Sequence, residues 1–372
     1  MRVEHHPLLT RNPCTQRQLI SFHYGQPGRA GKVYLQASLH ADELPGMLAL
    51  HHLRERLDSA EAQGQILGEI VLVPIANPIG LEQTLMHDAM GRFDFNSGEN
   101  FNRRYPDLAE AIRDRLAQEL TANVDENRQI IRRAMASVLK QLLPTSEIDS
   151  MRQAQLLLAH DADFVLDLHC DAQAVVHLYA ETPNWPQIEP LARYIGAQAS
   201  LLASGTDAGS FDEACGQPWW RLAETFAGRF PIPAGCVAAT VELRGEADVD
   251  HALARIDAAA LYAFLQHRGI LAGTPPPMPA LPQPATPFDG SLTLRAPCAG
   301  LVVFLHKPGA WIERDEPVVH VIDPISGASQ VVCSSTCGVM YMRSAIRFAA
   351  AGVELCKVAG ATALEGGVTV SA

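Results

Sequence analysis

The sequence lacks an excess of basic charge, a long apolar run and an apolar leader. Its 372 residues carry 29 Lys and Arg against 41 Asp and Glu, a net charge of −12, whereas a nucleic-acid surface needs a basic patch. No apolar run approaches the roughly 20 residues of a membrane-spanning helix, and the first residues, MRVEHH, contain no signal-peptide core. We therefore expect a cytoplasmic protein that binds neither nucleic acid nor membrane.

The cysteines lack the spacing of a disulfide framework or a zinc ribbon. Eight are scattered along the chain, and Cys333 and Cys337 form a pair with no second pair to match it. We interpret them as reduced thiols of a cytoplasmic protein. Hydrophobic residues make up 48% and charged residues 19%, which is typical of a globular chain long enough for a large and a small domain.

Prolines mark one boundary in the chain. Residues 274–288 read TPPPMPALPQPATPF, and seven prolines remove so many backbone donors that we expect a stiff, extended linker without helix or sheet pairing. After the linker, short β-branched runs alternate with Gly and Pro, which predicts a small all-β domain of barrel or sandwich type over residues 289–372. Residues 1–273 then form the large domain.

Within the large domain, strand patterns alternate with helix patterns. Residues 33–39 alternate as a strand, and Pro45 begins a helix with an apolar stripe. Apolar runs at 70–76, 164–168 and 236–241 predict buried strands, and residues 253–264 predict a late helix. This order predicts an α/β fold with a mixed, mostly parallel sheet flanked by helices. Residues 107 to about 144 look helical and rich in charge, which indicates a surface insertion.

Two histidines and a glutamate suit a metal site. His40 and Glu43 follow the first strand pattern, and His169 follows another. Two imidazoles and one carboxylate leave a fourth zinc position open for water, which is typical of hydrolytic rather than structural sites. We expect one Zn²⁺ per chain, although cobalt or manganese also suit these donors. Glu242, after a third strand pattern, could act as general base on the water.

The shared placement of these residues carries more weight than any one of them. In open α/β sheets, ligands bind beyond the carboxyl ends of the strands, so three strands would bring their polar residues to one edge. Alone, His169 would be an ordinary strand-end histidine, and Glu242 could pair with nearby Arg244. Asp167 and Asp42 could orient a ligand imidazole or cap turns, and the sequence does not separate these alternatives.

A polar loop between the first and third strand patterns suits an anion. Residues 91–103 read GRFDFNSGENFNR and contain Arg92, Asn102 and Arg103. Arginine binds a carboxylate through two parallel hydrogen bonds, asparagine adds a donor, and one arginine remains free to stabilise a developing oxyanion. The alternative is a solvated surface loop with incidental charge.

Taken together, these segments resemble the succinylglutamate desuccinylase/aspartoacylase family, which has a zinc carboxypeptidase-like fold. The resemblance covers roughly residues 30 to 270, and the small β domain is similar to the C-terminal domain of these deacylases. The matching segments, in order, are His40-Ala41-Asp42-Glu43, Asn77-Pro78-Ile79-Gly80, Arg92 through Asn102-Arg103, Asp167-Leu168-His169 and Val241-Glu242-Leu243.

The resemblance implies a role for each candidate residue. His40, Glu43 and His169 would hold zinc, and Glu242 would activate the water and pass its proton to the leaving amine. The scissile carbonyl would be polarised by Arg92, and the carboxylate of the amino-acid part would be bound by Asn102 and Arg103. Where many relatives have Thr-Gly after the second histidine, this chain has Cys170-Asp171, and the charge of Asp171 could favour an amine-bearing substrate.

The leading hypothesis is therefore a zinc-dependent amidohydrolase that removes the acyl group from an N-acylated amino acid or a related small amide. A metallocarboxypeptidase acting on short peptides is the second hypothesis, because the anion clamp suits a peptide C-terminus equally well. A non-catalytic binding protein with this fold is the third. The small β domain offers only Lys307 and Lys357, neither at a carrier-type hairpin, so we expect it to pack or to form a homo-oligomer contact.

Overall fold

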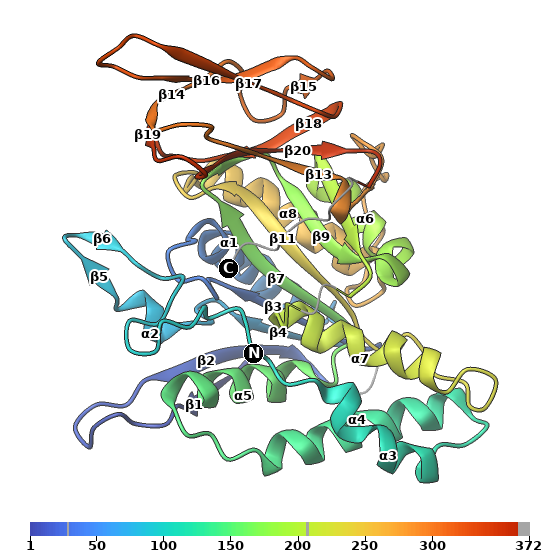
Figure 1. The fold of residues 1–372 in the computed structure, drawn as a ribbon. Helices are drawn as coiled ribbons and strands as arrows, with labels where there is room; N and C mark the ends of the chain where they lie inside the picture. The colour runs from blue at the N-terminus through green and yellow to red at the C-terminus, as the bar shows by residue number, and fades with distance from the viewer. Residues whose placement is uncertain (28–29, 206–207, 364–372) are drawn as a thin grey trace.

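A nine-stranded mixed sheet forms the centre of the computed structural model, which describes residues 1–27, 30–205 and 208–363 (Figure 1). Strands β4, β3, β7 and β11 run parallel, whereas the pairs β1–β2, β2–β4 and β11–β9 are antiparallel. The mixed, mostly parallel sheet predicted from the apolar runs is thus confirmed. In spatial order its strands are β1 (Arg2–Pro7), β2 (Gln18–Gly25), β4 (Glu69–Val73), β3 (Lys32–Ala37), β7 (Phe164–Asp171), β11 (Val237–Gly245), β9 (His177–Glu181), β10 (Ala199–Ala203) and β12 (Thr286–Pro287).

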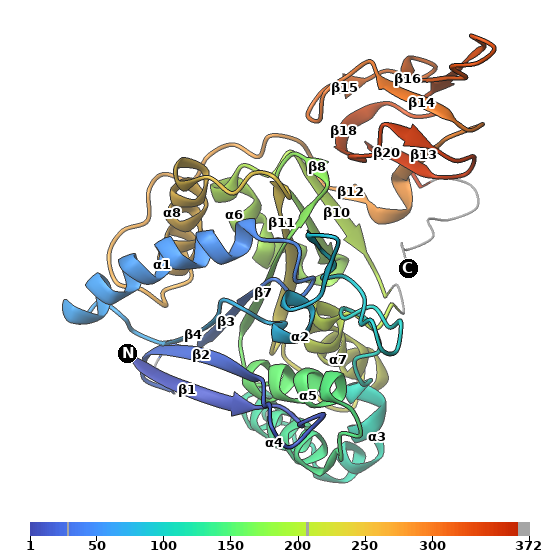
Figure 2. The same cartoon turned by 90° about the vertical axis from the view of Figure 1, so that its left-hand side faces the viewer.

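Helices cover both faces of this sheet (Figure 2). One face packs against α1 (Pro45–Ala62), α6 (Trp185–Ile195) and α8 (His251–His267). The other face packs against α3 (Leu108–Glu119), α4 (Val124–Gln141), α5 (Glu147–Ala159) and α7 (Phe211–Thr225). Each interface has its own apolar core, as a doubly covered sheet requires. Of the described helices, none combines the length and the apolar character needed to cross a bilayer.

The predicted surface insertion at residues 107–144 is wrong in its placement. The segment is helical, but it forms α3 and α4, which belong to the core on the second face of the sheet. Ile112, Leu116, Ile131 and Met135 are at most 1% exposed. The charges that suggested a surface insertion lie on the outer sides of these helices, so the segment has one apolar face and one charged face.

Two strands extend further than their apolar runs predicted. Strand β7 continues through His169 to Asp171, and β11 continues through Glu242 to Gly245. Glu242 pairs in register with His169, so both residues lie inside strands rather than after them. The polar side chains are tolerated there because they face a cavity, while the backbone pairing continues to an irregularity between Glu242 and Gly245.

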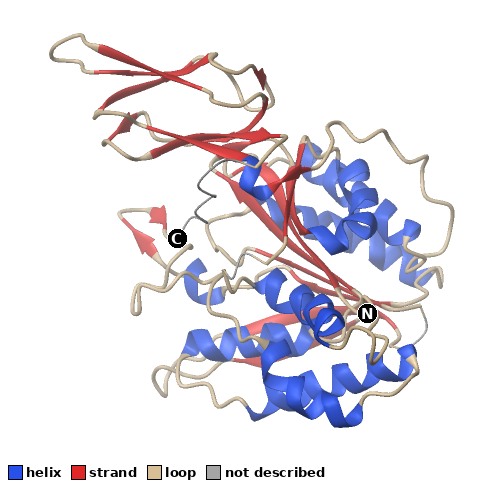
Figure 3. Ribbon diagram, turned by 45° about the vertical axis from the view of Figure 1, so that its right-hand side comes forward, coloured by secondary structure: helices blue, strands red, loops and turns tan. Residues whose placement is uncertain are grey.

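The small domain consists of two sheets with a shared apolar core (Figure 3). One contains β13 (Ser291–Arg295), β20 (Glu354–Gly360), β18 (Gly338–Arg343) and β15 (Trp311–Ile312), and the other β17 (Ser329–Cys333), β16 (Pro317–Ile322), β14 (Gly300–Phe304) and β19 (Phe348–Ala349). The large domain adds the short strand β8 (Gln173–Ala174) beside β18.

The proline-rich linker is not wholly without sheet pairing. Its last residues form β12, which pairs in parallel with β10 at the edge of the main sheet. The prediction of a linker without pairing is wrong at this point, because an edge strand tolerates a proline whose missing donor faces away from its partner.

Candidate metal centre and substrate cavity

A tight turn after β3 presents His40 and Glu43. Ser38 adopts a left-handed backbone conformation with φ 58°, and its hydroxyl donates a hydrogen bond to the carbonyl oxygen of Glu43 at 2.8 Å. The side-chain amide of Asn77 donates to the carbonyl oxygen of Leu39 at 2.9 Å. The backbone around both ligand candidates is therefore fixed before any ion binds.

The three predicted ligands converge in one buried group. The Nδ1 atoms of His40 and His169 lie 2.9 Å and 2.7 Å from the two carboxylate oxygens of Glu43. All three residues are at most 5% exposed, and one donor atom from each lies within 4.8 Å of the other two. The donor set and its convergence fit a zinc-type cation with an open position.

The outer nitrogens of both imidazoles face acceptors. His40 Nε2 lies 2.9 Å from the side-chain oxygen of Asn100, and His169 Nε2 lies 3.0 Å from Asp167 Oδ2, without the alignment of a good hydrogen bond. Because these oxygens only accept, each ring keeps a proton on Nε2, and Nδ1 is the atom that would give up its proton to bind a cation beside Glu43. Asp167 thus has the orienting position considered from the sequence, whereas Asn100 was missed.

Glu43 remains ionised in this setting. Burial alone would raise the pKa of its carboxyl, but His40 and His169 outweigh that effect and lower it well below the usual range. Without a cation, the two imidazoles share protons with this ionised carboxylate through their Nδ1 atoms. A divalent cation displaces those protons and is then held by the same three groups.

Glu242 is half-buried beside this group and has no ion-pair partner in the described structure. Its Oε2 atom is inaccessible to solvent and makes no hydrogen bond. The alternative pairing with Arg244 is wrong, because Arg244 has a left-handed φ of 65° and binds Asp257, with Nη1 3.0 Å from Oδ1. Burial, followed by the charge of Glu43, raises the pKa of Glu242 well above its ordinary value. A carboxylate with a raised pKa accepts a proton readily.

The polar loop places Arg92 at the edge of the metal group. Gly91 packs so tightly against the turn that an added Cβ would lie 2.2 Å from the backbone nitrogen of Asp42, so only glycine fits. Nη1 of Arg92 then lies 3.4 Å from Glu43 Oε1 and 3.2 Å from His40 Nδ1. The guanidinium therefore reaches the position where charge would develop on a substrate bound to the group.

Asn102 and Arg103 line the same cavity, and part of their bonding capacity is structural. The side-chain oxygen of Asn102 accepts a hydrogen bond from the backbone nitrogen of Phe211 at 2.8 Å, at the start of α7. Arg103 donates to the carbonyl oxygen of Asn102 at 2.7 Å. The structure brings both residues to the cavity of His40 and Glu242, and their binding of a carboxylate stays a prediction.

The cavity has a volume of about 290 Å³ and walls from both domains. The small domain contributes Tyr341, Glu354 and Lys357, and Lys357 Nζ lies 3.0 Å from Glu354 Oε1. Sequence reasoning interpreted this domain only as packing or oligomer contact. One signal was present, since Lys357 is a lone cation in the otherwise apolar second half of β20, Cys356 to Gly360.

A buried carboxyl in the cavity wall leads to a pH-dependent prediction. Burial raises the pKa of Glu181 to about 8, although Trp220 Nε1 donates to it. The folded state therefore prefers the neutral acid, and its stability falls as pH rises from the unfolded value of 4.5 through about 8. We expect Glu181→Gln to stabilise the protein above pH 8 by on the order of 3 kcal/mol and to have little effect near pH 4.5.

Urea unfolding at pH 5 and pH 9 measures this difference. The exposed Glu224 on α7 provides the matched control, and Glu224→Gln should leave the pH profile unchanged. Equal effects of Glu181→Gln at both pH values would contradict the assignment.

An α/β sheet with a buried His-Glu-His group and a carboxylate beside it fits a metal-dependent hydrolase. The family model for the succinylglutamate desuccinylase/aspartoacylase catalytic domain matches residues 29–268. The chain belongs to this succinylglutamate desuccinylase/aspartoacylase family, which confirms the resemblance drawn from the sequence. Membership of this family supports a hydrolase that acts on amide bonds.

Solved structures agree over nearly the whole chain. A family protein of Shewanella amazonensis SB2B is 26% identical, covers 96% of this chain and 98% of its own, and has a TM-score of 0.84. Another from Shewanella frigidimarina NCIMB 400 is 26% identical over 96% and 97% of the two chains, with a TM-score of 0.85. The ectoine utilization protein EutE (DoeB) of Ruegeria pomeroyi shares the fold at 17% identity, over 96% and 94%, with a TM-score of 0.68. No curated protein matches at a significant level.

Proposed function

We propose that the protein is a zinc-dependent deacylase that hydrolyses the amide bond of an N-acylated amino acid or a related small amide. One observation carries the proposal. The Nδ1 atoms of His40 and His169 converge on Glu43, and the unpaired carboxylate of Glu242 lies beside them. Membership of a family of desuccinylases and aspartoacylases supports the reaction type.

Each residue then has a chemical task. His40, Glu43 and His169 would hold the zinc ion, which when bound would supply Lewis acidity and lower the pKa of water. Glu242 accepts the proton of the attacking water and transfers it to the leaving amine. The positive charge of Arg92 stabilises the oxyanion that develops from the scissile carbonyl.

The size of the cavity favours a small substrate over a peptide. Its volume of about 290 Å³ lies at the lower end of the range for small-molecule sites, and the small domain forms part of its wall. Five acidic side chains besides Glu43 and Glu242 line it, against three basic ones. Burial keeps Glu181 neutral below about pH 8 and Glu354 pairs with Lys357, which leaves three acidic against two basic side chains and favours a cationic amino-acid part only slightly. The acidic five are Asp171, Glu181, Asp212, Glu213 and Glu354, and the basic three are Arg92, Arg103 and Lys357.

Metal content and activity of Glu43→Ala test the proposal. We expect wild-type protein to hold one more equivalent of zinc per chain than the variant, measured by elemental analysis after dialysis. We also expect it to deacylate Nα-acetyl amino acids with basic side chains faster than those with acidic side chains. Equal zinc content, or equal activity of the two proteins, would show that the three ligands do not form a catalytic metal centre.

A further inference from the structure

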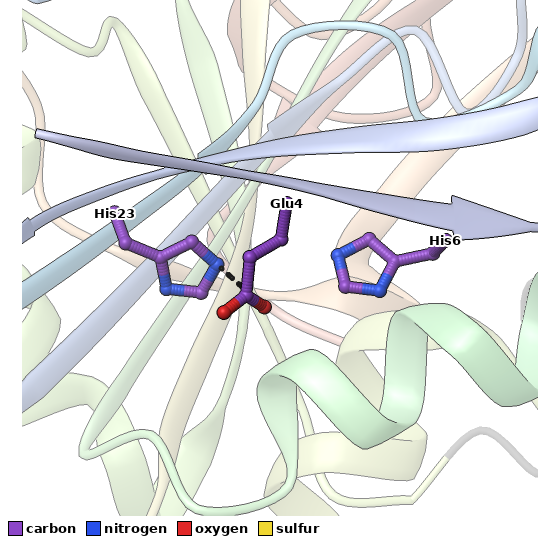
Figure 4. Close-up of side chains that lie close together, drawn as sticks. All are labelled: Glu4, His6 and His23. Atoms are coloured by element: carbon purple, nitrogen blue, oxygen red, sulfur yellow. Dashed lines mark ion pairs between the residues drawn. The ribbon is translucent and has the colours of Figure 1, made fainter.

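A second group of metal-type side chains lies on the hairpin of β1 and β2. Glu4 and His6 come from β1 and His23 comes from β2, and one donor atom from each lies within 4.8 Å of the others. In Figure 4 the Glu4 carboxylate lies between the two imidazole rings. Glu4 and His6 are two residues apart on one strand, so their side chains leave the sheet on the same face.

The surroundings of His23 direct one nitrogen lone pair into this group. His23 Nδ1 lies 3.3 Å from a carboxylate oxygen of Glu69, which only accepts, so the proton belongs on Nδ1. In the neutral ring, Nε2 then presents a lone pair, and it lies 3.4 Å from Glu4 Oε2. A lone pair and a carboxylate repel each other, and a cation between them removes that repulsion.

The other members of the group are equally suited to a cation. Ser21 Oγ lies 2.8 Å from Nε2 of both His6 and His23, so the hydroxyl oxygen is placed to become a fourth ligand of a cation bound between the rings. Arg2 occupies only Oε1 of Glu4, at 3.0 Å, and Oε2 remains directed at His23.

We propose that Glu4, His6 and His23 hold a second divalent cation of the zinc class. Two imidazoles and a carboxylate are the ligands such a cation prefers, and the contact of Glu69 with His23 is the arrangement that orients a ligand imidazole. The ion joins the edge strand β1 to β2, so its role is structural.

The hairpin site is separate from the candidate catalytic centre. From His23 on β2, two strand steps lead to β3, which precedes His40, and three lead to β7, which carries His169; these correspond to roughly 10 and 14 Å. Metal ions of a shared catalytic centre lie only about 4 Å apart. None of the three hairpin residues lines the described cavity.

A third group, His51, His52 and Glu55 on α1, is weaker than the hairpin group. Nε2 of His52 contacts His251 at 2.9 Å, outside the group, and only its Nδ1, 2.9 Å from Glu55, is directed at another member. The side chains of His51 and Glu55 are 56% and 61% exposed, so their ordering would cost conformational entropy.

Zinc binding to tag-free protein in the Glu43→Ala background tests the proposal, because that background removes the catalytic ion. We expect one equivalent of zinc per chain in equilibrium dialysis against about 10 µM free zinc. That concentration is about the largest dissociation constant expected for a site with three protein ligands. His6→Gln and the more exposed Glu4→Gln should each lose this equivalent, and Glu69→Gln should weaken binding about 10- to 100-fold. The metal should also raise the Tm of the background protein, and not that of His6→Gln.

His5 provides the matched control, because it lies next to His6 on β1 with its side chain on the opposite face. His5→Gln should keep both the zinc and the Tm shift. Absence of zinc from the Glu43→Ala protein would overturn the proposal. Zinc retained by both His6→Gln and Glu4→Gln would overturn it as well. Neither result bears on the deacylase activity, which is measured separately.

Discussion

Glu242→Gln should lower kcat about 1,000-fold and leave the zinc content unchanged. Glutamine has nearly the same shape as glutamate but cannot accept the proton of the attacking water. The carboxylate lies in register with His169 and has no ion-pair partner in the described structure, so its loss disrupts no salt bridge. Steady-state kinetics on the best Nα-acetyl substrate, with elemental analysis of the same sample, measures both effects.

Glu246 is the matched control for this experiment. It lies four residues further along, and Asp42 and Glu43 contribute to the upward shift of its pKa, but it does not line the cavity. Glu246→Gln should change kcat only about a few-fold, because it removes one charge outside the cavity whose effect on the site is screened by solvent and salt. Wild-type turnover in Glu242→Gln with metal bound would assign the base to another residue.

Arg92→Ala should reduce kcat by about 100- to 1,000-fold with little change in KM. The guanidinium lies beside His40 and Glu43, where charge develops only as the carbonyl is attacked. A contact that strengthens in the transition state raises kcat rather than ground-state affinity. Removing it should therefore leave substrate binding nearly intact.

Arg104 of the same loop tests the specificity of that effect. Its side chain is 71% exposed and pairs with Glu99, so Arg104→Ala should retain wild-type kinetics. A rise in KM with unchanged kcat in Arg92→Ala would instead assign Arg92 to binding the substrate carboxylate.

Much of the fold and the metal group could be predicted from local sequence. Apolar runs such as 164–168 identify buried strands, because both faces of a parallel sheet are covered. Placing His40, His169 and Glu242 at one edge needed only the rule that parallel strands share a carboxyl end. The three ligands could be recognised from their residue types and from their positions near strand ends, so their prediction required little knowledge of the tertiary structure.

The parts that could not be predicted depend on contacts between distant segments. Asn100 orients His40 across 60 residues, and nothing in the local pattern separates it from its polar neighbours. Helices α3 and α4 were misplaced because a charged outer face looks the same on a core helix as on an insertion. The cavity wall from Tyr341 and Lys357 depends on how two domains pack, which strand patterns do not encode.

The small domain is held to the large one by pairing of β18 with β8, where Met342 lies opposite Ala174 and Arg343 opposite Gln173. A shift of one residue in this pairing would move the strand by about 3.3 Å relative to His169 and reverse which side chains face the cavity. The register of this one short pairing therefore decides whether Tyr341 and Met342 form part of the cavity wall.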